Sequence, residues 1–146
     1  MRRGALGGIA AAAAWAAAEP VAGRIFRTPY SDVRLLGRPL TAGPLWRPLG
    51  VAVHLANGAV FGALFERLGG RGPRAGIAAA LAENVALWPG MAVVDRYHPD
   101  RRSGAWPPLL LNGRVFAYEA TMHVFFGAVL GLMLRAGARQ DHLQGH

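Results

Sequence analysis

The chain of 146 residues contains no cysteine and no lysine, and only eight of its residues are Asp or Glu. Without cysteine the protein cannot form disulfides, use thiolate chemistry or bind zinc through cysteine ligands. The sequence also has no phosphate-binding loop, dinucleotide-binding fingerprint, HExxH sequence or nucleophile motif around a serine. These absences favour a protein that is not an enzyme.

The basic residues, all of them Arg, give the chain a net charge of +8, but they are not spread along one helix face as nucleic-acid binding would require. They flank long apolar runs instead. Arg2 and Arg3 precede the first run, for example, and Arg67 and Arg71 follow the second. Membrane proteins keep arginine at such positions, near lipid headgroups. We therefore expect the lipid bilayer as a partner, and not nucleic acid.

Four segments are long and apolar enough to cross a membrane, which needs about 20 residues in a helix. They are rich in Ala and Gly and lack the alternating pattern of a membrane β-barrel. The predicted fold is therefore all-α: one transmembrane domain over residues 1–146, multi-pass in the cell membrane, with a flexible polar tail at 137–146. The expected spans are residues 5–22, 49–65, 75–94 and 115–134.

Two parts of the sequence resemble each other and predict an internal repeat. The nine residues from His54 match five of the nine from His123 at an offset of 69, and residues from Gly8 match those from Gly76 at an offset of 68. We expect two tandem helical hairpins, residues 5–66 and 73–135, that enter the membrane in the same direction as a parallel repeat. The first segment also fits a cleavable signal peptide, but its counterpart at 75–94 cannot be one, which favours a span.

The arginines also bear on orientation. Under this topology the loops at 23–48 and 95–114 share one face, and the termini and the loop at 66–74 share the other. The first face carries nine arginines and the second seven, but those of the second lie closer to the span ends. Since arginine near a span matters most, we expect cytoplasmic termini. Abundant Ala, Gly, Arg and Pro are typical of GC-rich genomes and favour a bacterial inner membrane.

Polar side chains at membrane depth are the candidate site residues, because burying such groups in lipid is costly. With a rise of about 1.5 Å per residue, several fall in the half of the membrane beneath the loops at 23–48 and 95–114. Glu19 lies nearer that boundary and can reach the interface. The set comprises His54, Asn57, Glu83, Asn84, Glu119 and His123.

Glycines follow both histidines on the same helical stripe and allow close helix packing through Gly-x-x-x-Gly motifs. If residues 49–65 pack on residues 115–134 through them, His54 and His123 face each other, and Glu119 lies one turn from His123. The motifs can also join copies of the chain, or another membrane protein, into an oligomer. The glycines are Gly58, Gly62, Gly127 and Gly131.

Three interpretations of the polar cluster stay open. The favoured one is a structural or accessory membrane protein, or one that binds a small ligand; a purely structural role requires Glu83 and Glu119 to be held by neighbours such as Asn57 or Asn84 in a dry core. The second is a proton-linked or small-solute transporter with the Glu and His residues as a relay. The third is a metal- or haem-binding module, although we favour no cofactor. Its ligands would come from His54, His123, Glu119 and Glu83.

Overall fold

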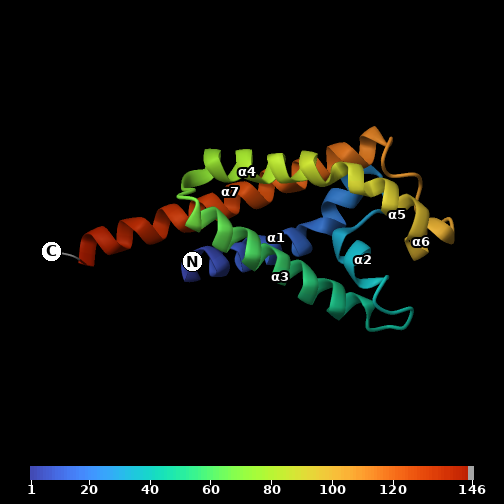
Figure 1. Ribbon diagram of the computed structural model, residues 1–146, viewed down its shortest axis with the longest axis horizontal. Helices are drawn as coiled ribbons and strands as arrows, with labels where there is room; N and C mark the ends of the chain where they lie inside the picture. Colours follow the sequence, from blue (N-terminus) through green and yellow to red (C-terminus); the bar gives the residue numbers. More distant parts are fainter. Residues whose placement is uncertain (145–146) are drawn as a thin grey trace.

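The computed structural model describes the backbone of residues 1–144 and the side chains of residues 1–136 (Figure 1). Regular structure in the described chain is entirely helical, and four helical segments are long and apolar enough to cross a membrane. This confirms the predicted class. The elements are α1 (Arg2–Phe26), α2 (Asp32–Gly37), α3 (Trp46–Arg67), α4 (Gly72–Leu87), the 3-10 turn η1 (Trp88–Gly90), α5 (Met91–Tyr97), α6 (Pro99–Arg102) and α7 (Gly113–Gln144).

The spans extend beyond the predicted limits and cover Arg2–Phe26, Trp46–Arg67, Gly72–Tyr97 and Gly113–Ala136. The third is not one regular helix, because α4 gives way to η1 at Pro89 before α5 continues. Proline lacks the N–H that an α-helix would use there. Helix α7 continues to Gln144, through most of the segment expected to be a tail. Residues 145–146 and the side chains of 137–146 lie outside the described residues.

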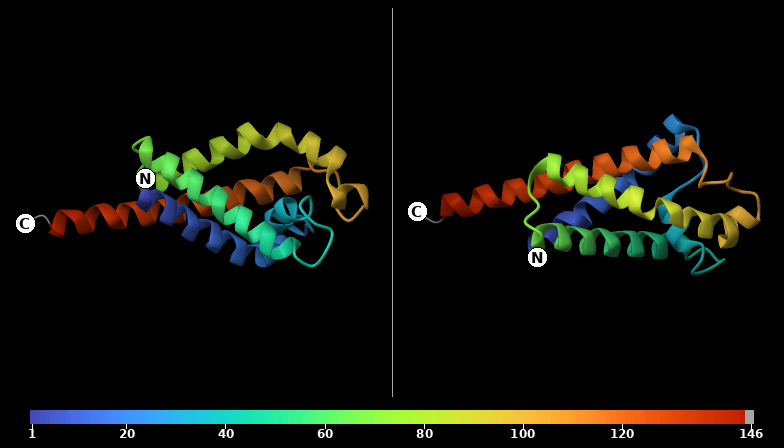
Figure 2. Two further views of the ribbon diagram at one scale, coloured as in Figure 1. Left: turned by 60° about the horizontal axis from the view of Figure 1, so that its bottom comes forward. Right: turned by 45° about the horizontal axis from the view of Figure 1, so that its top comes forward.

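Each long helical hairpin is packed through glycine. In the first hairpin the backbone of Gly8 contacts Gly58, and in the second Gly76 contacts Gly127. Figure 2 shows the two helices of each hairpin, α1 with α3 and α4 with α7, side by side. A Cβ at any of these positions would collide with the facing backbone. The same pattern recurs one turn away, where Gly4 meets Gly62 and Gly72 meets Gly131. The glycines of α3 and α7 thus face the preceding helix of their own hairpin, so they do not form the α3–α7 contact that we considered.

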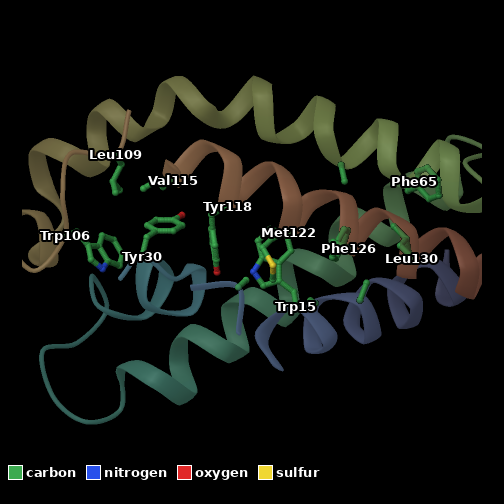
Figure 3. Close-up of a cluster of buried hydrophobic side chains, with 14 of the residues drawn as sticks. Trp15, Tyr30, Phe65, Trp106, Leu109, Val115, Tyr118, Met122, Phe126 and Leu130 are labelled. Carbon is green, nitrogen blue, oxygen red and sulfur yellow. The ribbon is translucent and has the colours of Figure 1, made fainter. Parts of the chain in front are cut away.

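The bundle is completed by contact of α1 with α7 and by the loops at one end. Arg34 of α2 makes two hydrogen bonds, each of 2.8 Å, to the Asp100 carboxylate at the start of α6. The indole of Trp106 donates to the carbonyl of Pro29 at 3.0 Å, and its ring stacks on His98 at 4.5 Å. These contacts tie the two long loops together. Figure 3 shows the aromatic core that runs from this end into the bundle.

Candidate functional site

A cavity of about 190 Å³ lies inside the bundle, between α1, α2, α3, α4 and α7. Among the residues predicted from the sequence, it brings together His54 and Asn57 of α3, Glu83 of α4 and His123 of α7. Asp32 of α2 joins them, and no arginine lines the cavity. The apolar wall includes three aromatic side chains: Trp15, Phe61 and Phe126.

Trp15 is the centre of this site, and sequence reasoning missed it. Its indole contacts the imidazole of His54 at 5.4 Å and that of His123 at 4.8 Å between ring centroids, both edge to face. The two histidines therefore gather around one buried indole from α1. A tryptophan within an apolar run carries no signal at the sequence level, since it packs as readily against lipid as against a site.

The two imidazoles are held differently. Nδ1 of His123 lies 2.8 Å from the backbone carbonyl oxygen of Glu119 and 3.6 Å from its Oε2. A carbonyl only accepts, so Nδ1 carries the proton and donates it. His54 is 9% exposed, and its Nε2 has no hydrogen-bond partner among the described residues. The cavity wall thus includes an imidazole whose buried Nε2 is left without a hydrogen-bond partner.

The side chain of Glu19 is buried in the protein and does not extend to the membrane interface. It accepts hydrogen bonds from the Ser31 hydroxyl at 2.6 Å, the Asp32 amide at 2.7 Å, and more distantly the Val33 amide and the Trp15 indole, both at 3.3 Å. An anion at a helix N-terminus satisfies the free amides there. Glu19 therefore fixes the start of α2, and with it the position of Asp32.

The carboxyl groups of Asp32 and Glu119 lie within hydrogen-bonding reach of each other. Asp32 Oδ1 accepts from the Tyr30 hydroxyl at 3.1 Å, whereas Asp32 Oδ2 and Glu119 Oε1 are buried without a donor. Two ionised carboxylates only accept, so one proton shared between the two groups would stabilise this contact. Burial, and then the nearby charge of Glu19, raise the pKa of Asp32, in keeping with such a proton.

Glu83 and Asn84 do not form the hydrogen bonds that a purely structural role requires. Glu83 is half-buried at the cavity and makes no hydrogen bond or ion pair within the described part of the chain. Asn84 is 4% exposed, yet its Nδ2 has no partner there either, and it does not line the cavity. Neither Asn57 nor Asn84 holds Glu83 or Glu119 in place.

A second hollow, of about 620 Å³, opens on the loop side of α2 between α1 and α3. It reaches Glu19, Tyr30 and Ser31, whereas Asp32, the next residue, lines the inner cavity. The N-terminus of α2 therefore separates the two hollows. Polar side chains bridge this division, since Glu19 contacts Ser31 and the amide of Asp32.

The described residues contain no group of three or more His, Asp or Glu arranged to hold a metal ion. The indole of Trp15, which contacts both imidazoles, also occupies the space that a haem ligated by His54 and His123 would fill. The geometry thus gives no support to the cofactor interpretation. Comparisons with protein-family models, curated proteins and solved structures found no match for the chain.

Proposed function

We propose that the protein binds a small molecule in the cavity around Trp15, inside its membrane-spanning bundle. The observation that carries this proposal is the nine-tenths-buried His54, whose Nε2 lacks a partner at the cavity wall. Leaving a buried polar group unpaired costs about 1–3 kcal/mol. A core that served packing alone would not keep His54 in this state beside a half-buried Glu83 that also lacks a partner.

The size of the cavity limits what it can take. Its volume of about 190 Å³ equals that of roughly six water molecules at about 30 Å³ each. A compact molecule of fewer than about ten non-hydrogen atoms fits this space. The site therefore has room for a metabolite-sized ligand.

Cysteine labelling tests this proposal well, because the natural chain has no cysteine. Both test positions are exposed on α3. Asn57→Cys places a thiol at a position that lines the cavity, and Val60→Cys places one at a 61% exposed position that does not. In proteoliposomes we expect a small water-soluble thiol reagent to label Asn57→Cys and to leave the lipid-facing Val60→Cys unlabelled. Equal resistance of both thiols would show that no small polar molecule enters, and would refute the proposal.

A second candidate is proton-linked transport, and the Asp32–Glu119 pair between two hollows favours it specifically. A shared proton at this position can be exchanged between the two hollows, because Asp32 lines the inner cavity and the adjacent Ser31 lines the outer hollow. In vesicles holding a pH-sensitive dye, a potassium diffusion potential should drive proton flux that Asp32→Asn reduces. Flux equal to that of empty vesicles would remove the relay.

We also propose that the two hairpins arose by duplication and that the termini are cytoplasmic. The equivalent glycine contacts Gly8–Gly58 and Gly76–Gly127 support the duplication. The density of arginine beside the spans supports the orientation. Reaction of a cysteine placed at Arg2→Cys with an impermeant reagent, in intact cells and in inverted vesicles, tests the orientation: labelling only in inverted vesicles is expected.

A further inference from the structure

We propose that the ligand of this cavity is a small organic cation, and that its binding displaces the proton shared by Asp32 and Glu119. This inference rests on the proposed function and adds to it the chemical class of the ligand. It stands on three features of the described residues: the signs of the charges around the cavity, the aromatic wall, and the unsatisfied carboxyl pair.

The charges around the cavity have one sign. Titratable groups face it or lie directly behind it from every packed helix: Glu19 of α1, Asp32 of α2, His54 of α3, Glu83 of α4, and Glu119 and His123 of α7. Three of these groups are carboxyl groups of α1, α2 and α4, a fourth is Glu119, and no arginine lines the cavity. Carboxylates in a low-dielectric site without a counter-charge attract a cation and repel an anion.

The aromatic wall narrows the class to an organic cation. Trp15, Phe61 and Phe126 line the cavity together with the polar groups, and aromatic faces stabilise alkylammonium groups through cation–π attraction. A metal ion needs several converging ligands, and the described residues contain no group of three that can supply them. An ammonium group that bears short alkyl substituents matches both the acidic and the aromatic surfaces.

Proton release follows from charge balance. Before binding, Asp32 and Glu119 together hold one proton and one negative charge. When a monocation enters, that proton leaves to water, and the pair becomes two carboxylates facing one added positive charge. The net charge of the site is unchanged, which avoids the cost of adding a charge to a buried site.

Two probes of equal size separate charge from shape. Tetramethylammonium and tert-butanol each have five non-hydrogen atoms and a compact methyl surface, but only the first is charged. Calorimetry on detergent-purified protein should detect tetramethylammonium binding and no comparable binding of tert-butanol. Repeating the titration in buffers of different ionisation enthalpy counts the protons released. About one proton per cation is expected, with affinity rising up to tenfold per pH unit.

Variants of the two carboxyl groups test whether they release the proton when the cation binds. Asp32→Asn should abolish proton release and weaken tetramethylammonium binding at least tenfold, and Glu119→Gln should act in the same direction. Glu66→Gln is the matched control, because it changes a carboxyl that binds the backbone amide of Gly4 at 2.7 Å, at the other end of the bundle. It should bind as the wild type does. If both cavity variants fail to fold, the proton count of the wild-type protein still decides the question.

The outcomes distinguish failure of the cation inference from failure of the proposed binding function. If the Asn57→Cys thiol is labelled but tetramethylammonium does not bind, binds no better than tert-butanol, or binds without releasing a proton, the cavity remains a binding site and the cation inference is overturned. If the thiol is not labelled at all, the proposed function itself fails. Cation binding with release of about one proton, together with protection of the Asn57→Cys thiol, supports both.

Discussion

Substitution of Gly58 by alanine should separate α1 from α3. A Cβ on Gly58 would lie 2.6 Å from the carbonyl oxygen of Gly8 and 2.7 Å from the Cβ of Ala12. Backbone and a first side-chain carbon cannot rotate out of the way, so the two helices must move apart. Overpacking of this kind costs about 1–3 kcal/mol. Alanine regains about 1 kcal/mol of helix propensity. The net loss in the free energy of unfolding is then about 0–2 kcal/mol relative to the wild type, and about 1–3 kcal/mol relative to alanine at an unobstructed glycine.

The assay is reversible unfolding in detergent or bicelles, with Gly90→Ala as the matched control. Gly90 has a φ of −62°, which alanine adopts freely, and a Cβ there would meet nothing within 4 Å. The control should unfold as the wild type does or slightly later. Gly127→Ala should lose about as much as Gly58→Ala, because its Cβ would lie 2.6 Å from the amide nitrogen of Ile77. A Gly58→Ala protein as stable as the Gly90→Ala protein would refute the close contact of α1 and α3.

Four further predictions concern the loop face and its titration. Glu19→Ala removes the acceptor of four donors, and should lower the unfolding free energy by about 3 kcal/mol or more, which chemical denaturation measures. Asp100→Asn breaks the paired contact of a 1% exposed carboxylate with Arg34 and should cost about 2–3 kcal/mol and increase proteolysis of the loops. Burial raises the pKa of Asp32, so the folded state favours its protonated form. The free energy of unfolding should therefore fall as the pH rises above about 4, the ordinary pKa of aspartate. Asp32→Asn should flatten that dependence. Burial lowers the pKa of His98, so the free energy of unfolding should fall as the pH drops below about 6.5. The fall should be smaller in His98→Asn, which keeps a side-chain acceptor at the start of α6.

The membrane spans could be predicted because length and hydropathy alone decide them. Each observed span contains its predicted counterpart, with the ends displaced outward by a few residues. The break at Pro89 was missed because a proline near the end of an apolar run leaves the hydropathy of that run unchanged. The partners of the glycines could not be predicted either. Gly-x-x-x-Gly indicates that a helix approaches another closely, but it does not identify the other helix.

Part of the candidate site followed from membrane depth, and part depended on tertiary structure. His54, Glu83 and His123 were singled out as polar residues in apolar runs, and the structure places all three at one cavity. Asp32 was not, since it lies in a loop by hydropathy. It reaches the cavity only because Glu19 caps α2 and holds this short helix against the bundle. Nothing in the local sequence indicated that this short helix would pack at the cavity.

The contrast between the acidic groups is the strongest argument that the cluster does more than stabilise the fold. Glu19 is buried with donors for both of its oxygens, as expected of a carboxylate that serves structure. Glu119 is buried nearby and Asp32 is half-buried, and each has a buried oxygen without a donor among the described residues. The same fold therefore satisfies one carboxylate fully and leaves the adjacent pair without such donors. Since unpaired buried groups are costly, a pair in this state next to a cavity is best explained by a proton, or a cation, that comes and goes.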